Sequence, residues 1–383
     1  MREEVRYEAA RIEVLDGLEA IRRRPGMYAG STGTRGLHGM VLGVFEHAVN
    51  ETAAEERRTV ELTLTADGGV RIADHGPGIP FGASADDGGP GLDDRLLHFR
   101  AGRPVVGRDR LRAWSSGMEL TVANALSARM RAEVHRGGSC WVREFERGTA
   151  LAPPALAGPS GRTGTTLTFH PDPEIFETVD CSFAFLGERL RELAFLHPGL
   201  DVTLTDERPA GGPAVRRYRC TDGVRDFAVS LAAAHSLAPP QDVLAFASDA
   251  PRMAGVLDVA LVWTAEGPGR VLGYANGRAT PHGGTHLEGF GRGLAGAVTS
   301  YARACGLLSG TDPAIAPEAA RSGVTAVVSV RLDAPEFVGS TLTTLGGGDA
   351  VRACVEQAVR EHVLLWLEND AERAARVVRG LVA

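Results

Sequence analysis

An aspartate and two glycines follow directly on a strand-like run, and this pattern limits the possible folds more than any other feature of the chain. The run Val70-Arg71-Ile72-Ala73 ends at Asp74, and Gly76 and Gly78 come next in the turn. An aspartate at a strand end can accept a hydrogen bond from an exocyclic amine, and glycines two apart let the backbone close over a flat ring. The pattern predicts a purine pocket, with an ordinary strand and turn as the alternative.

Two further segments carry related signals. Residues 36–51 place apolar side chains at helical spacing, which predicts a helix packed on a core. Gly43, His47 and Glu51 recur every four residues and therefore share a second face of that helix. Residues 161–169 indicate a tight turn that leads into an alternating strand, whose hydroxyl groups can face a ligand. These three blocks, in this order, resemble the nucleotide pocket of the GHKL ATPases.

Three other segments narrow the resemblance to one family. The basic run RRRPGMY at residues 22–28, the GGTH turn at residues 283–286 and the strand at residues 323–330 are similar to segments of the DNA gyrase B and topoisomerase IV B proteins. The resemblance extends over nearly the whole chain. It implies an α+β fold in which a GHKL (Bergerat) ATPase-like α/β sandwich with a mixed sheet is followed by a ribosomal-protein-like βαβ transducer domain.

A domain boundary is expected at the turn-rich segment 207–213, which separates two strand-like stretches. Residues 1–212 are then the ATPase-like domain with an N-terminal dimerisation arm, and residues 213–383 are the transducer-like domain. The chain ends before the strand-passage domain that follows in gyrase. We therefore expect a stand-alone module that cannot cleave DNA by itself.

The N-terminal arm predicts a homodimer. In the family this arm reaches over the pocket of a second protomer, and Tyr7 and Ile12 occupy the matching positions. The amphipathic run from Val5 to Leu18 must bury its apolar face, and a twofold partner can cover it. Packing of the arm on its own domain is the alternative.

The chain departs from the family where a chemical role is assigned. The family has a glutamate general base and, one turn later, an asparagine that holds Mg²⁺, and the corresponding residues here are Gly43 and His47. Glycine cannot abstract a proton, and an imidazole nitrogen is a poor partner for a hard cation that prefers oxygen. Glu46 points about 60° away from the Gly43 direction on a helical wheel, and Glu51 is no obvious substitute. We therefore expect defective hydrolysis and doubtful Mg²⁺ binding.

The phosphate-contacting segments are altered as well. The lid keeps the NALS helix but retains only Gly117 of three glycines, with Trp114 and Glu119 at the other two positions. Backbone amides of a glycine-rich loop cradle phosphates, and bulky or anionic residues there obstruct or repel them. The transducer loop reads Ser340-Thr341-Leu342 where the family has Gln-Thr-Lys, and the chain contains no lysine at all. Affinity for the phosphates of ATP should fall.

The adenine end of the pocket is retained, either for ligand binding or for folding. ATP or another adenine-like ligand is the expected occupant. The residues that match family positions around the purine are Asp74, Gly76, Gly78, Ile79, Pro80, Arg136 and Thr165. The full expected ligand-binding set adds His47, Glu51, Trp114 and Gly117.

Composition excludes several functions. A formal net charge of -7 argues against direct DNA binding, which needs clustered positive charge. The 5 cysteines are scattered without a CxxC pair, which argues against a metal site and a disulfide framework. The charged amino end lacks an apolar signal core, and no run is long enough to span a bilayer. A cytoplasmic location is therefore expected.

Three functions remain open. In the first, a binding or regulatory module holds a small molecule, hydrolyses ATP slowly or not at all, and acts through dimerisation, through a topoisomerase or by sequestering gyrase-directed inhibitors. In the second, an enzyme of specialised metabolism has been derived from the nucleotide pocket. Its candidate catalytic groups are the neighbours His47 and Glu46 and the neighbours Asp74 and His75, with Trp114 as an aromatic wall.

The third function is an active ATPase that serves a type II topoisomerase. It requires Glu46 or Glu51 as an improvised base and Arg103 or Arg110 as cationic help. This function is the least compatible with the departures at Gly43, His47 and Leu342.

Overall fold

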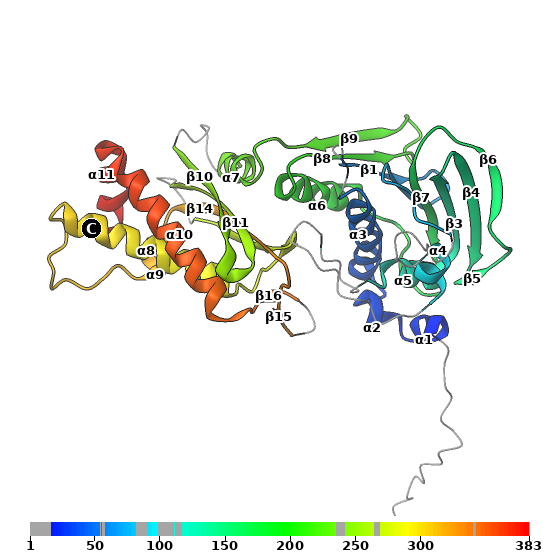
Figure 1. The fold of residues 1–383 in the computed structure, drawn as a ribbon, viewed down its shortest axis with the longest axis horizontal. Helices are drawn as coiled ribbons and strands as arrows, with labels where there is room; N and C mark the ends of the chain where they lie inside the picture. The colour runs from blue at the N-terminus through cyan, green and yellow to red at the C-terminus, as the bar shows by residue number, and fades with distance from the viewer. Residues whose placement is uncertain are drawn as a thin grey trace, which may run out of the picture.

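The computed structural model describes residues 17–53, 55, 58–81, 91–98, 111, 117–234, 242–263, 269–339 and 342–382. These residues form two regions, each built around its own sheet (Figure 1). The strands are β1 (Arg58–Leu64), β2 (Val70–Asp74), β3 (Ser127–Arg136), β4 (Ser139–Glu146), β5 (Thr149–Ala150), β6 (Ala155–Pro159), β7 (Gly164–Pro171), β8 (Leu200–Asp206), β9 (Ala214–Arg219), β10 (Val243–Ala250), β11 (Gly255–Trp263), β12 (Val271–Ala275), β13 (Arg278–Ala279), β14 (Val324–Leu332), β15 (Phe337–Val338) and β16 (Thr344–Leu345).

The helices lie between and beside these strands in the chain. They are α1 (Gly17–Arg23), α2 (Pro25–Ala29), α3 (Thr34–Glu51), α4 (Leu92–Leu97), α5 (Glu119–Ala125), α6 (Phe183–Leu196), α7 (Val224–Ala233), a 3-10 turn η2 (Pro251–Met253), α8 (Thr285–Ala304), α9 (Pro317–Ala320), α10 (Gly348–Glu368) and α11 (Ala371–Val382). None of the helices in the described part of the chain is long and apolar enough to cross a membrane.

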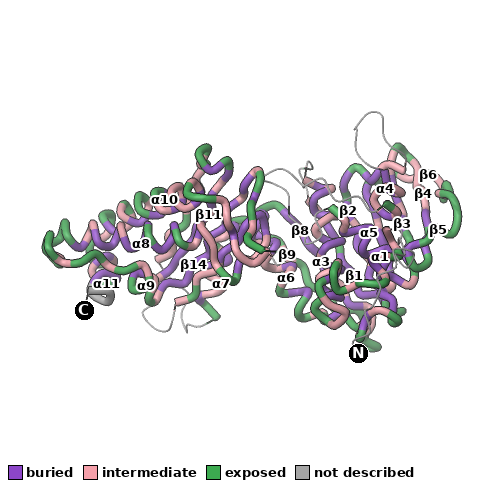
Figure 2. The backbone as a smooth tube through the Cα atoms, turned by 90° about the horizontal axis from the view of Figure 1, so that it is seen from below, coloured by how far each residue is buried: buried purple, intermediate pink, exposed green. Residues whose placement is uncertain are grey.

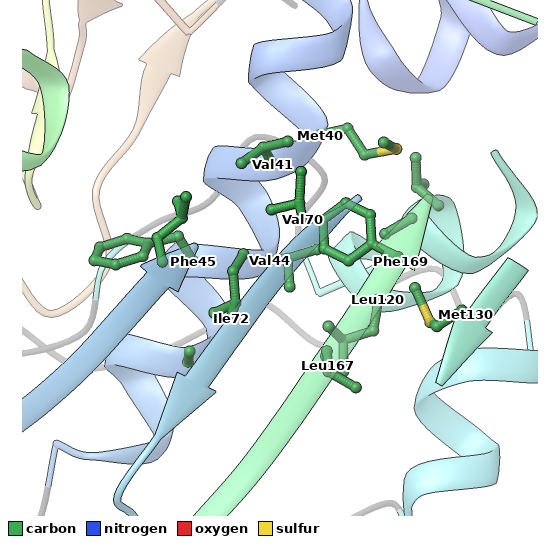
Figure 3. Packing of buried hydrophobic residues seen from close by; sticks show 14 of the residues in the cluster. Met40, Val41, Val44, Phe45, Val70, Ile72, Leu120, Met130, Leu167 and Phe169 are labelled. Atoms are coloured by element: carbon green, nitrogen blue, oxygen red, sulfur yellow. The ribbon is translucent and has the colours of Figure 1, made fainter. Parts of the chain in front are cut away.

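The first region is a mixed sheet with helices packed against it. Its strand order is β5-β4-β3-β7-β2-β1-β8-β9, and β6 pairs with β4. Strand β1 runs antiparallel to β2 and parallel to β8, so the expected mixed sheet is confirmed. Helices α3, α5 and α6 share one buried core with this sheet. The core between α3 and the sheet is apolar, as Figure 3 shows for Val44 of α3 beside Val70, Ile72 and Phe169.

Side-chain alternation along β2 determines where its last residue points. Val70, Ile72 and Asp74 are buried, and the two residues between them are partly exposed. Because successive side chains of a strand point to opposite faces, Asp74 shares the helix-covered face with Val70 and Ile72. The next residue, His75, is exposed. The strand period therefore brings one carboxylate into the core side of the sheet beside α3.

The second region is a five-stranded sheet in the order β10-β11-β14-β12-β13. Strands β12 and β14 are parallel and are connected through α8, which is the expected βαβ arrangement. Alternate residues of β14 divide between two cores. Val328 and Val330 pack with α8 and α10, whereas Val327 packs with Phe227 of α7 and Leu196 of α6. Buried segments occur in both regions (Figure 2).

The change from the first sheet to the second comes after β9. Strand β9 pairs antiparallel with β8 from Asp201 opposite Arg219 to Asp206 opposite Ala214, so it belongs to the first sheet. A boundary at residue 212 separates β9 from the sheet in which it is hydrogen-bonded. We therefore propose that the domains divide between Arg219 and Val224, where α7 begins.

Candidate functional site

The side chain of Asp74 lies at the centre of the site. It is buried, and its Oδ1 accepts a hydrogen bond of 2.9 Å from the backbone nitrogen of Gly76. A Cβ at position 76 would lie 2.8 Å from the carbonyl oxygen of Glu51 on α3. Only glycine lets the turn approach the helix this closely. The turn after β2 therefore holds Asp74 against the last turn of α3.

Hydrogen bonds tie the same turn to β3 and β7. The backbone nitrogen of Ile79 donates to Oγ1 of Thr165 at 3.0 Å, and Nη1 of Arg136 donates to the carbonyl oxygen of Gly78 at 2.8 Å. Gly78 has a φ of 78°, and a Cβ there would lie 2.6 Å from the carbonyl oxygen of His135. The position therefore requires glycine.

The turn also contacts α4. The carbonyl oxygen of Pro80 accepts a hydrogen bond of 2.7 Å from the backbone nitrogen of Leu92, at the start of that helix. The seven residues that were predicted to surround a purine therefore lie along one connected turn and its two supporting strands. Their spatial grouping agrees with the sequence prediction, and their role in ligand binding stays a prediction.

The acidity of Asp74 is shifted strongly by its surroundings. Burial raises its pKa from the ordinary value of 3.8 to about 7, and the charge of Glu51 acts in the same direction. Backbone hydrogen bonds from Gly76 and Thr165 and the charge of Arg95 lower the pKa in part. A carboxyl group that titrates near neutrality can accept hydrogen bonds when ionised or donate one when protonated.

An arginine from α4 occupies the second face of α3. Nη1 of Arg95 donates to Oε1 of Glu51 at 2.7 Å and lies 3.2 Å from Nε2 of His47. Nε2 of His47 and Oε1 of Glu51 are themselves 3.7 Å apart. The side chains of all three are largely buried. His47 and Glu51, which were expected to share this face of α3, therefore lie close together, and Arg95 neutralises the local negative charge.

The residues at this face do not fit Mg²⁺, which the family resemblance implies. Mg²⁺ demands nearly octahedral coordination by oxygen. His47 offers nitrogen, and Oε1 of Glu51 is already paired with the guanidinium of Arg95, which would repel a cation. Within the described residues, no three His, Cys, Asp or Glu side chains are grouped so that they could hold a metal ion.

Glu119 fills the space next to Gly43. A Cβ built at position 43 would lie 3.4 Å from Cγ and 3.6 Å from Cβ of Glu119. The carboxylate of Glu119 turns back on the lid, where Oε1 accepts a hydrogen bond of 2.9 Å from the backbone nitrogen of Gly117. Glu119 is 5% exposed. The lid residue thus lies directly against the position of the family's general base.

The two histidines of the proposed catalytic pairs lie close to carboxylates other than their sequence neighbours, and the catalytic role of the pairs stays a prediction. His75 is exposed, and its Nε2 lies 3.6 Å from Oε1 of Glu61. Nε2 of His47 lies 3.7 Å from Oε1 of Glu51. Burial raises the pKa of Glu46 to about 7, against the charges of Arg189 and Arg278. Adjacent residues on a strand or a helix point in different directions, which explains both outcomes.

Several predicted residues lie outside the described part of the chain. They are Tyr7, Ile12, Arg103, Arg110, Trp114, Ser340 and Thr341. Leu342, which follows Ser340 and Thr341 in the transducer loop, is described. It has a φ of 52°, and its carbonyl oxygen accepts a hydrogen bond of 3.1 Å from Nε of Arg278.

Two residues of the site were missed by sequence reasoning. Arg95 lies far along the chain from the helix that it contacts, and no spacing rule connects the two. Asn50 is buried and exchanges two hydrogen bonds with the backbone of Leu111, at 2.9 Å and 2.8 Å. Its position on α3, next to Glu51 and facing inward, was the only available signal.

Comparisons with known proteins agree with this geometry. A sequence model of DNA gyrase B matches residues 223–383. The chain is 38% identical over 391 aligned positions to the novobiocin-resistant gyrase B of Streptomyces niveus, covering 98% of this chain and 58% of the relative. It is 37% identical over 395 positions to the novobiocin-sensitive gyrase B of the same organism, covering 97% and 58%.

A solved structure extends the likeness to three dimensions. The 43K ATPase domain of Thermus thermophilus gyrase B, in complex with an aminocoumarin, matches with a TM-score of 0.76 and 30% identity, covering 96% of this chain and 94% of that one. The chain spans about 58% of the length of the curated relatives above. The chain belongs to the DNA gyrase B family and has the fold of the ATPase region of that family.

Proposed function

We propose that this protein is a ligand-binding module that holds a small, adenine-like or aminocoumarin-like molecule at the Asp74 end of the pocket and does not hydrolyse ATP efficiently. The observation that carries the proposal is the contrast around α3. Asp74 and Thr165 keep a connected polar frame, whereas the neighbouring face of α3 has no side chain at position 43 and carries the Arg95–Glu51 ion pair.

The polar frame suits a flat ligand with neighbouring donor and acceptor groups. Asp74 can take either protonation state near neutral pH, and a buried polar group gives specificity because an unmatched ligand leaves it unpaired. Arg136 is partly exposed, and its guanidinium donates a hydrogen bond to the carbonyl oxygen of Gly78. These features support recognition of a ring system and do not require a phosphate.

The absence of a proton acceptor at Gly43 supports slow or absent hydrolysis. General-base catalysis needs a group within hydrogen-bond reach of the attacking water. Position 43 has no side chain, and the nearby Glu119 is engaged with the amide of Gly117. Arg95 adds positive charge where the family places a metal, so the two ends of the pocket serve different purposes in this chain.

The relatives suggest which small molecules to test. Two of them are distinguished in their names by resistance or sensitivity to novobiocin, and the matching solved structure contains an aminocoumarin. A module that retains Asp74, Arg136 and Thr165 without hydrolysis could sequester such an inhibitor and protect an intact gyrase. Regulation of a topoisomerase through a homodimer is the other form of the same proposal.

Isothermal titration calorimetry tests the proposal. Novobiocin and adenosine are titrated into the protein, into Asp74→Asn and into Asp67→Asn, a control whose aspartate lies in a surface cluster with His170. We expect binding of at least one ligand to the wild type and the control, and a loss of about tenfold or more in Asp74→Asn, because one buried polar contact is removed. Absence of heat from both ligands in the wild type would sink the proposal.

A second function rests on the pKa of Asp74. A buried carboxyl group with a pKa of about 7 suits general acid–base catalysis, which favours an enzyme derived from the nucleotide pocket. In that case Asp74→Asn abolishes turnover of a bound small molecule but leaves its binding nearly intact. Equal losses of binding and turnover would leave the binding module as the better description.

A further inference from the structure

Glu119 and Gly43 form a tightly packed pair contributed by two different helices. Glu119 begins α5, Gly43 lies in the middle of α3, and the two helices pack against each other. The position that a Cβ of residue 43 would take is 3.4 Å from Cγ of Glu119, at the tight end of ordinary van der Waals contact. In the family that this chain resembles, a glutamate occupies the position of residue 43 on α3, and a glycine occupies the position of residue 119 in the lid. In this chain the two residue types are exchanged.

We propose that Glu119 occupies the volume left by the missing side chain at position 43, and that its carboxylate makes this end of the pocket selective against anionic groups. Glu119 is thus a specificity-determining residue: it excludes phosphate-bearing ligands while the Asp74 end still admits an uncharged ring. This inference rests on the proposed function, because it explains which ligands the module accepts.

Little space remains beside the pair among the described residues. The cavity between α2, α3 and α5 has a volume of about 10 Å³, and its lining includes Tyr28, Met40, Gly43, Glu119 and Val122. A volume of this size holds at most one water molecule. A glutamate side chain at position 43 would therefore compete with Glu119 for this space.

The carboxylate of Glu119 is hydrogen-bonded within the lid. Oε1 accepts the hydrogen bond of the Gly117 amide, which is the kind of backbone donor that an anionic ligand would otherwise use. A carboxylate at this position also repels an incoming negative group over short distances in a buried environment. The carboxylate therefore acts as an internal anion that competes with an external one.

A residue exchange tests the spatial part of the proposal without any ligand. Gly43→Glu, Glu119→Gly and the double variant are compared with the wild type by thermal unfolding. We expect Gly43→Glu to lower Tm by about 5 °C through overpacking and charge repulsion. The double variant should recover most of that loss, because the carboxylate again stands on only one of the two helices. Additive effects of the two substitutions would overturn the proposal.

Ligand selectivity tests the electrostatic part. Affinity is measured for adenosine and for a non-hydrolysable ATP analogue, with Glu119→Gln as a variant that keeps the volume and removes the charge. We expect Glu119→Gly to strengthen binding of the ATP analogue about tenfold and to leave adenosine unchanged, with Glu119→Gln intermediate. An unchanged preference in both variants would contradict the proposal.

The outcomes separate this inference from the proposed function. If the wild type binds neither adenosine nor novobiocin, the proposed function fails, while the unfolding measurements still decide whether residues 43 and 119 share one space. If the wild type hydrolyses ATP and Glu119→Gln abolishes that activity, Glu119 is the general base and the exclusion role is overturned. Recovery of Tm in the double variant, together with selective gain for the ATP analogue, is the supporting result.

Discussion

The two ends of the pocket differ in what constrains their residues. At the Asp74 end, Gly76, Gly78 and Gly164 stand where an added Cβ would lie 2.8, 2.6 and 2.0 Å from backbone oxygens. At the other end, positions 43, 47 and 119 carry residues whose identity the local backbone does not dictate. The fold alone therefore retains the glycines. Asp74 and Thr165 are not required by such crowding, although each accepts one hydrogen bond from a backbone amide of the turn.

The largest expected effect is at Gly164, where the comparison predicts a purely structural role. Gly164 has a φ of 129°, and its Cβ would lie 2.0 Å from the carbonyl oxygen of Asp74. Gly164→Ala should lower the free energy of unfolding by about 3–5 kcal/mol, as measured by chemical denaturation. The matched control Gly161→Ala, where a Cβ meets nothing within 4 Å, should change it by less than about 1 kcal/mol. If Gly164→Ala and Gly161→Ala lowered the free energy of unfolding equally, crowding of the Cβ at position 164 would not explain the effect.

Arg95→Ala tests the ion pair on the second face of α3. It leaves the largely buried carboxylate of Glu51 without its guanidinium, so the free energy of unfolding should fall by about 2 kcal/mol. The control is Arg71→Ala, which breaks a more exposed pair of the same 2.7 Å length with Glu207 and should cost about 0.5 kcal/mol. If Arg95→Ala instead proves neutral, Arg95 does not stabilise this face of α3.

Thr165→Val separates folding from binding at the Asp74 end. The substitution leaves the buried amide of Ile79 without its acceptor, which should lower the free energy of unfolding by about 1–2 kcal/mol. Thr166→Val is the control, because the next residue of the strand points to the other face. A stable Thr165→Val protein that also binds adenosine and novobiocin normally would show that the threonine has no role in the site.

The pH dependence of stability gives the most specific of these effects. The folded-state pKa of Asp74 is raised from 3.8 to about 7, so between these values the folded protein holds a proton that the unfolded chain has lost. Stability therefore falls as pH rises from 4 to 7, by at most about 1.4 kcal/mol per pH unit for one group. Asp74→Asn should flatten this slope in denaturation curves measured across that range. Glu46 contributes a slope of the same sign, so an unchanged slope in Asp74→Asn would assign the effect to Glu46.

Helices and strands of the fold could be predicted because apolar residues recur along them with the period of each element. The apolar spacing of residues 36–51 predicted the helix that is observed as α3, and the run ending at Asp74 predicted β2. The βαβ connection of the second region was also predicted, and it is confirmed by the parallel pairing of β12 with β14. The helix and the strand depend on residues that are close together in the chain, whereas the βαβ connection was implied by the family resemblance.

The composition of the site was only partly predictable. Asp74, Gly76 and Gly78 could be identified from their local order, but Arg95 reaches His47 and Glu51 only through the packing of α4. The opposite orientations of Asp74 and His75 follow from the strand period and could have been predicted. The contact between Gly43 and Glu119 could not, because it depends on how closely α3 and α5 approach each other.

The most direct test of the central claim is phosphate release by the purified protein at saturating ATP and Mg²⁺. The claim is that the ring-binding end of the pocket is retained, whereas the end that would cleave the terminal phosphate is not. We predict no Mg²⁺-dependent release above that of Asp74→Asn measured at the same high protein concentration. Robust Mg²⁺-dependent release by the wild type that Asp74→Asn abolishes would contradict the account.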